Sequence, residues 1–191
     1  DDPEPDLLHG LGLSAGVAAQ PLHRRLQGTG VYAPPGDIAR PRRWGYSAAM
    51  HRVRVKIEGL RDAETALAVA RLGADAVGLV FAPSPRQVTA EQARAVTAAL
   101  PPWVASVGVF VNADPTDVRA TAGRAGVGFV QLHGDEPPET LDRVGLPCIK
   151  AFRIRGEESL AEMEQWLAAA EGRPHLAGVV LDAYDPAVRG G

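Results

Sequence analysis

The chain has 191 residues, a formal net charge of −3 at pH 7 and 46% hydrophobic residues, so it is long enough to bury the core of one domain. Its near balance of acidic and basic residues, with no strong basic cluster, argues against a nucleic-acid-binding protein. The single cysteine, Cys148, excludes an internal disulfide and fits a reducing cytoplasm. No apolar run approaches the ~18 residues of a membrane-spanning helix, so no membrane association is expected.

Residues 1–49 differ in texture from the rest of the chain. They are rich in proline and glycine and show no sustained period of either 2 or 3.6 residues. We therefore expect an irregular extension there, disordered or foreign to the fold, and a folded domain over residues 50–191.

From Arg52 onward, short apolar runs alternate with segments of helical pattern. The runs are continuous, as in strands that are buried on both faces of a parallel sheet. They lie at Val53–Ile57, Ala76–Phe81, Val104–Val111, Phe129–Leu132, Cys148–Phe152 and Ala177–Leu181. The helical segments are Asp62–Leu72, Thr89–Leu100, Asp114–Gly126, a short helix that opens at Glu136, and Glu157–Ala170.

This strict βα order predicts a parallel sheet with right-handed crossovers. An open doubly wound sheet and a (β/α)8 barrel both fit the order. The open sheet is the weaker alternative, because the turn Glu58–Arg61 after the first strand does not match the glycine-rich phosphate fingerprint. A complete barrel typically needs ~250 residues, so a barrel here would be incomplete, with about six βα strands.

Two of the apolar runs end in a carboxylate. Glu58 closes the first run, just before Gly59, and Asp182 closes the last. Barrel enzymes carry their chemistry at the carboxyl ends of the strands. The two carboxylates therefore predict an acid/base pair.

Six short motifs occur in order at these strand ends. They are Lys56–Gly59, Gly78–Arg86, Val107–Val111, Val130–Gly134, Ile149–Phe152 and Leu181–Pro186. Together with Gly190 and Gly191, they resemble phosphoribosylanthranilate isomerase of tryptophan biosynthesis. The resemblance implies a TIM barrel that performs the Amadori rearrangement of N-(5′-phosphoribosyl)anthranilate. It also implies a small phosphorylated substrate and no metal or organic cofactor.

The resemblance assigns roles to several residues. Asp182 matches the general acid, and Glu58 stands at the position of the general base. Arg86 is expected to face the anthranilate carboxylate, as a bidentate fork onto a planar anion. Gln131 and His133 are expected to point in different directions, one lining the pocket and the other bonding to the loop. For His133, an uncharged ring satisfied by the backbone is an equal alternative.

The sequence departs from the family pattern in two places. The family has cysteine where this chain has Glu58, so an adapted carboxylate base and a lost base both stay open. Gly190 and Gly191 stand where the family continues into a phosphate-binding turn, so the C-terminal quarter of the barrel is expected to be missing. The alternative function is then a non-catalytic barrel remnant or a partner-binding paralogue. Open barrel edges would also favour a homo-oligomer or self-association.

Overall fold

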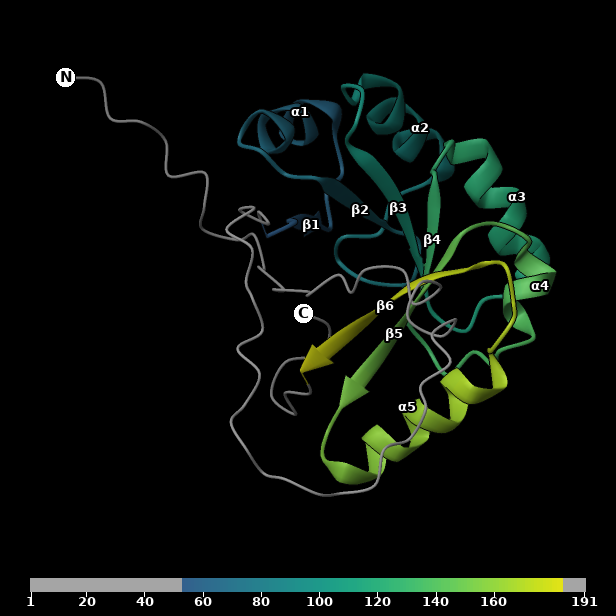
Figure 1. Ribbon diagram of the computed structural model, residues 1–191. Helices are drawn as coiled ribbons and strands as arrows, with labels where there is room; N and C mark the ends of the chain where they lie inside the picture. Colours follow the sequence, from purple (N-terminus) through teal and green to yellow (C-terminus); the bar gives the residue numbers. More distant parts are fainter. Residues whose placement is uncertain (1–52, 184–191) are drawn as a thin grey trace, which may run out of the picture.

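The computed structural model describes residues 53–183, in which six strands alternate with five helices (Figure 1). The strands are β1 (Lys56–Glu58), β2 (Ala76–Val80), β3 (Ala105–Phe110), β4 (Phe129–Leu132), β5 (Cys148–Ile154) and β6 (Leu176–Ala183). The helices are α1 (Ala63–Arg71), α2 (Ala90–Ala99), α3 (Pro115–Ala125), α4 (Thr140–Val144) and α5 (Glu157–Ala169).

The strands form one parallel sheet in the order β1-β2-β3-β4-β5-β6. The sheet curls, and the helices lie along its outer, convex side (Figure 1). A doubly wound sheet would carry helices on both faces. The predicted incomplete TIM barrel is therefore confirmed for the described residues, and the doubly wound alternative is wrong.

Local signals in the sequence explain where several helices begin and end. Thr89 and Gln92 form a capping box at the start of α2, as their spacing predicts. Asp114 accepts a hydrogen bond from the backbone of Thr116, and proline opens α3. The helix ends at Gly126, which takes the left-handed conformation.

The fourth helix starts later than predicted. It begins at Thr140, and Glu136 lies in the preceding loop. The Glu136 carboxylate accepts hydrogen bonds from the backbone nitrogens of Asn112 and Gly134 and from Lys150. These tertiary contacts hold Glu136 in the loop, in place of a role at the helix start.

The hydrophobic core lies between the sheet and the outer helices. One cluster joins β2 to α1 and α2 and includes Val77, Leu79, Val69 and Val96. A second joins β4 and β5 to α3 and α4 and includes Phe110; its largest fully buried members are Val118, Val130, Leu132, Leu141, Val144 and Cys148. Because the described helices pack on the convex side, they leave the concave side of the sheet uncovered.

Cys148 belongs to this second cluster. Its side chain is fully buried. Burial, and then the charge of Glu136, raises the pKa of the thiol to about 12. The thiol is therefore a packing group and not a nucleophile.

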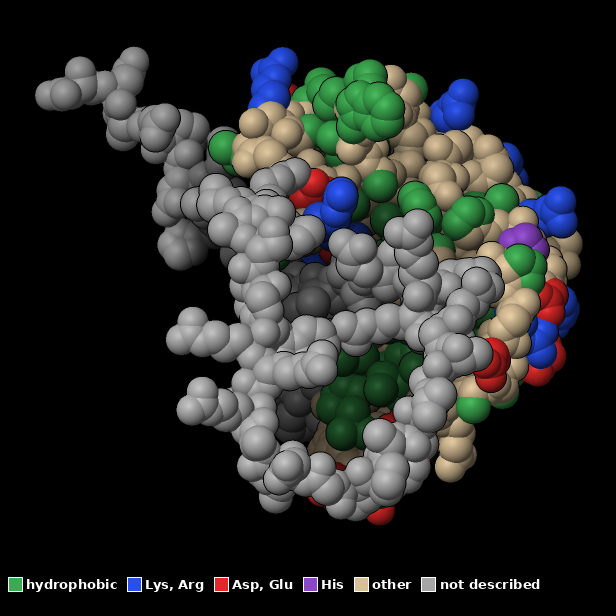
Figure 2. All heavy atoms as spheres, viewed as in Figure 1, with side chains coloured by type: hydrophobic (Ala, Val, Ile, Leu, Met, Phe, Trp, Pro, Cys, Tyr) green, Lys and Arg blue, Asp and Glu red, His purple; other side chains and the backbone are tan. Residues whose placement is uncertain are grey.

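The surface over α3 and α4 mixes acidic and basic side chains (Figure 2). None of the helices within residues 53–183 has the length and apolar character needed to cross a bilayer. The expectations for residues 1–49, and for Gly190 and Gly191, fall outside the described residues.

Candidate active site

Polar side chains from three strands meet on the concave face of the sheet. Lys56 and Glu58 come from β1, Gln131 and His133 from β4 and the residue after it, and Asp182 from β6. Side chains alternate between the two faces along a strand, so residues two apart share one face. Lys56 Nζ lies 2.5 Å from Gln131 Oε1, although β2 and β3 separate their strands. The curl of the sheet brings these distant strands within reach.

The five side chains form one continuous chain of hydrogen bonds. Glu58 Oε2 accepts from Lys56 Nζ at 2.5 Å, and Lys56 also donates to Gln131. Gln131 Nε2 lies 2.9 Å from His133 Nδ1. His133 Nε2 lies 3.2 Å from Asp182 Oδ2. The two carboxylates that the sequence singles out therefore stand at the two ends of this chain.

One expectation about these hydrogen-bonded side chains is wrong. Gln131 and His133 do not point in different directions: their side chains share the concave face and bond to each other. The physical reason is the two-residue period of a strand, which places positions 131 and 133 on one side. His133 is also bonded to Asp182 rather than satisfied by backbone alone.

Glu58 has its space on the concave face because its neighbour in β2 is glycine. Glu58 pairs with Gly78 in the parallel register. A Cβ atom at position 78 would lie 2.7 Å from Glu58 Cγ and 3.2 Å from its Cα. The Glu58 side chain is 19% exposed and faces Lys56. A side chain at position 78 would therefore displace the carboxylate.

Arg86 lies against Gly59, the residue that follows Glu58. It follows β2 in the loop, and its backbone nitrogen donates to Ser84 Oγ at 3.1 Å. Its side-chain stem passes over Gly59, where an added Cβ would collide with Arg86 Cδ. Gly59 has a φ of +86°, a conformation that glycine adopts without strain. The stem of the arginine is thus packed against the turn that follows Glu58.

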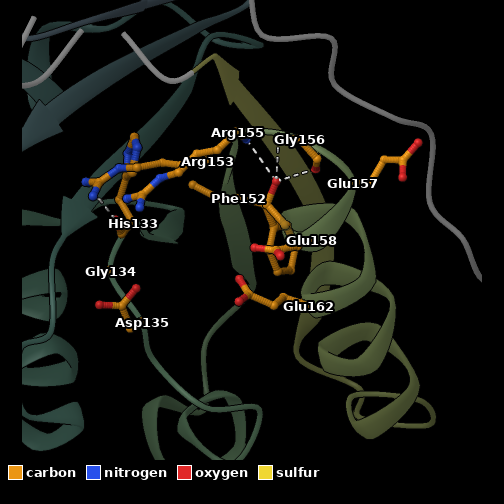
Figure 3. A pocket seen from close by; sticks show the side chains of 12 residues that line it. His133, Gly134, Asp135, Phe152, Arg153, Arg155, Gly156, Glu157, Glu158 and Glu162 are labelled. Atoms are coloured by element: carbon orange, nitrogen blue, oxygen red, sulfur yellow. Dashed lines mark hydrogen bonds between the residues drawn. The ribbon is translucent and has the colours of Figure 1, made fainter. Parts of the chain in front are cut away.

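A cavity of about 650 Å³ opens on the other side of His133. It lies between the ends of β4 and β5 and the start of α5, and Glu158 and Glu162 point toward it (Figure 3). Arg153 Nη2 lies 3.4 Å from the carbonyl oxygen of His133. This cavity shares His133 with the hydrogen-bonded chain but does not reach Glu58.

Sequence reasoning missed Arg153. It pairs in register with Asp182 across β5 and β6, so it shares the concave face. The signal was present: a charged residue near the end of an apolar run, like Glu58. Residues Arg155 and Gly156 follow it and turn the chain into α5, with both backbone nitrogens donating to Ser159 Oγ (Figure 3).

A buried ion pair supports the loop that follows His133. Lys150 and Glu136 are 3% and 4% exposed, and Lys150 Nζ lies 3.1 Å from Glu136 Oε2. Lys150 also donates to the carbonyl of Gly134 at 2.6 Å. Burial lowers the pKa of Lys150, and the charge of Glu136 opposes that shift. The pair ties β5 to the end of β4.

Within residues 53–183, no group of three or more histidine, cysteine or acidic side chains is arranged to hold a metal ion. The described chain offers acid/base groups instead. Two carboxylates near charged and hydrogen-bonding partners, at the carboxyl ends of barrel strands, are suited to moving protons on a small substrate.

Comparison with known proteins relates this chain to one enzyme family. A family profile described as N-(5′-phosphoribosyl)anthranilate (PRA) isomerase matches residues 55–189. An N-(5′-phosphoribosyl)anthranilate isomerase of Symbiobacterium thermophilum is 47% identical over 137 residues, which are 72% of this chain and 59% of that protein. The Geobacter sulfurreducens protein of the same name is 49% identical over 140 residues, or 73% of this chain and 65% of its own length.

Solved structures agree with this assignment. The phosphoribosyl anthranilate isomerase of Thermotoga maritima has a TM-score of 0.63 and 37% identity, covering 71% of this chain and 63% of its own. A second solved isomerase, in complex with reduced 1-(o-carboxyphenylamino)-1-deoxyribulose 5-phosphate, has a TM-score of 0.62 and 37% identity, covering 70% of this chain and 66% of its own. The chain thus spans about three fifths to two thirds of the length of these relatives. It belongs to the N-(5′-phosphoribosyl)anthranilate isomerase family.

Proposed function

We propose that this chain carries the isomerase function of its family, the Amadori rearrangement of N-(5′-phosphoribosyl)anthranilate. The observation that supports it best is the placement of Glu58 and Asp182. Both lie on the concave face at the carboxyl ends of their strands, joined by the hydrogen-bonded chain through Lys56, Gln131 and His133. An acid and a base on one face are what this rearrangement needs.

In this proposal Asp182 gives a proton to the furanose ring oxygen. The bond between that oxygen and C1′ breaks, and the nitrogen lone pair forms a protonated Schiff base. Glu58 then removes the C2′ proton, and the electron pair of that C–H bond moves toward nitrogen to give an enolamine. Tautomerisation gives the aminodeoxyribulose product. Substrate and product are isomers, so no external oxidant or reductant takes part.

We propose further that Glu58 replaces the cysteine base of the family. A carboxylate can accept a proton at neutral pH, because a free glutamate has a pKa of ~4.3. Glutamate is longer than cysteine, and a misplacement of ~1 Å can cost ~100-fold in rate. The bond to Lys56 and the space above Gly78 both support a fixed position for the longer side chain.

The same proposal assigns the substrate's two anionic ends. Arg86, whose stem packs against Gly59 in the turn after Glu58, would bind the anthranilate carboxylate. The ligand in the second solved isomerase carries both a carboxyphenyl group and a phosphate. Gly190 and Gly191 would begin a phosphate-binding turn, and the C-terminal quarter of the family barrel would complete it. Within residues 53–183, β1 and β6 each pair with one neighbour, so self-association through these edges is also part of the proposal.

The test compares Glu58→Gln and Asp182→Asn with the parent chain. Conversion of N-(5′-phosphoribosyl)anthranilate is followed by NMR, through loss of the C2′ proton signal. Each substitution should lower turnover by roughly 10²-fold or more, the usual size of a lost general acid or base. Asp117→Asn, on the exposed face of α3, is the matched control and should leave turnover unchanged.

The ion pair between Glu58 and Lys56 also suits a non-catalytic member of the family, in which the glutamate is merely a structural partner. Glu58→Cys separates the two possibilities. If Glu58 is an adapted base, this substitution lowers turnover. An inactive parent that gains activity with cysteine at position 58 would show that the base has been lost.

A further inference from the structure

The hydrogen-bonded chain between the two carboxylates has a fixed donor direction, and Gln131 determines it. We propose that Gln131 is a positioning residue, which holds His133 as the neutral tautomer protonated on Nε2 and so presents a donor to Asp182. The catalytic consequence rests on the function proposed above. The tautomer itself does not.

The direction starts at Lys56. An ammonium group has three donors and no acceptor, so the Gln131 atom beside it, 2.5 Å away, must be the carbonyl oxygen. The amide nitrogen of Gln131 therefore faces His133. An amide nitrogen only donates, so His133 Nδ1, 2.9 Å from it, must be the acceptor.

A neutral imidazole with an accepting Nδ1 carries its proton on Nε2. That nitrogen lies 3.2 Å from Asp182 Oδ2, where it can donate to the carboxylate. The orientation of the Gln131 amide thus decides which nitrogen of His133 is protonated. Lys56, which fixes that amide, is two hydrogen bonds away from the His133 ring.

The surroundings leave Gln131 no alternative orientation. Its side chain is 1% exposed, so water cannot take the place of either partner. Its strand lies between β3 and β5, in register with Val109 and Ile149. Rotation of the amide would set its NH₂ group against the Lys56 ammonium and its oxygen against an accepting nitrogen.

The charged groups nearest to His133 come from two other strands. Asp182 faces it from β6, and Arg153 from β5 approaches its carbonyl oxygen at 3.4 Å. Lys56 and Glu58 reach it only through Gln131. Because Oδ2 of Asp182 is occupied by His133, the other carboxyl oxygen is the one that would hold and release the catalytic proton. Gln131 would act on that step without touching the substrate.

The test measures the tautomer directly, by ¹⁵N NMR of histidine-labelled 191-residue chain at about pH 8, where a free imidazole is neutral. His133→Gln identifies the signals of this ring. The parent should show protonated Nε2 and unprotonated Nδ1. Gln131→Glu, whose ionised side chain only accepts, should move the proton to Nδ1. Gln87→Glu adds the same charge at an exposed site in the loop after β2, and it should leave the His133 signals unchanged.

A parent with its proton on Nδ1, or a Gln131→Glu variant with the parent tautomer, would overturn the proposal. Lys56→Met gives a second route if Gln131→Glu fails to fold. Without the ammonium the amide can rotate, so a mixture of tautomers is expected, and an unchanged single tautomer would also overturn it.

The kinetic consequence is tested separately. Gln131→Glu should lower kcat by roughly 10- to 100-fold with KM unchanged, because the residue acts through His133 and Asp182. The predicted tautomers in a chain that never isomerises the substrate would support the positioning role and refute the proposed function. Isomerase activity in a parent chain whose His133 proton lies on Nδ1 would support the proposed function and refute the positioning role.

Discussion

The buried ion pair between Lys150 and Glu136 carries the strongest stability prediction. Lys150 is 3% exposed and Glu136 is 4% exposed. Besides the carboxylate, the carbonyl oxygens of Leu132, Gly134 and Ala151 lie within hydrogen-bond distance of Lys150 Nζ and share its three N–H donors. Lys150→Met keeps an unbranched apolar stem but removes every one of these donors. It leaves the Glu136 carboxyl buried and without its cation.

Removing one partner of a buried pair costs ~3–5 kcal/mol, because the other charge stays buried without compensation. A small domain has a free energy of unfolding of only ~5–15 kcal/mol. Lys150→Met should therefore remove a large share of the stability. In Lys150→Met with Glu136→Gln, the amide is neutral and its oxygen still accepts from the backbone of Asn112 or Gly134. The double variant should therefore be more stable than the sum of the two single changes predicts, by ~1–3 kcal/mol.

Urea unfolding of the four chains, followed by circular dichroism, completes this double-mutant cycle. Arg143→Met is the matched control, because its partner Asp114 lies 3.5 Å away in a pair whose side chains are 61% and 53% exposed. An exposed pair is worth ~1 kcal/mol or less. If Lys150→Met cost no more than Arg143→Met, or if the two single changes simply added, the account of a tightly coupled buried pair would be wrong.

The site and the core also lead to testable expectations. Gly78→Ala should destabilise the chain by ~1–3 kcal/mol in urea unfolding and lower turnover, because the added Cβ lies 2.7 Å from Glu58 Cγ. In the native chain Cys148 should resist alkylation at pH 8 and react fully in denaturant. The pKa of the Cys148 thiol rises from 9.0 to about 12 on folding. The contribution of the buried, protonated thiol to the free energy of unfolding is therefore complete below pH 9 and is lost as the pH rises toward 12. Cys148→Ser should not show this pH-dependent loss of stability, which amounts to at most ~1.4 kcal/mol per pH unit. Two expectations given above belong with these. Glu58→Gln should lower turnover, and Gln131→Glu should move the His133 proton from Nε2 to Nδ1.

Much of the fold was predictable because local signals and the global fold agree. Continuous apolar runs located the strands, and Thr89 and Asp114 marked helix starts. The carboxylates at the ends of two runs, Glu58 and Asp182, were found because a charge at the end of a buried strand contradicts the surrounding pattern. The two-residue period of a strand would also have placed Gln131 and His133 together, so that error was one of reasoning.

Other features depend on contacts that no local pattern encodes. Glu136 precedes two prolines and looks like a helix start, yet the distant Lys150 and two backbone nitrogens hold it in a loop. The bond from Lys56 to Gln131 depends on the curl of the sheet across β2 and β3. Sequence spacing gives the order of the strands, but the curl of the sheet depends on the twist and stagger of neighbouring strands.

The hydrogen-bonded chain also explains how charged side chains can line this face without a large penalty. Buried polar groups are costly when unpaired, and among residues 53–183 no buried side-chain nitrogen or oxygen lacks a partner. Each end of the chain occupies one carboxylate oxygen: Oε2 of Glu58 and Oδ2 of Asp182. In the function proposed above, the two oxygens of each carboxylate would have separate tasks. One oxygen holds the side chain in place through its hydrogen bond, and the other would exchange protons with the substrate.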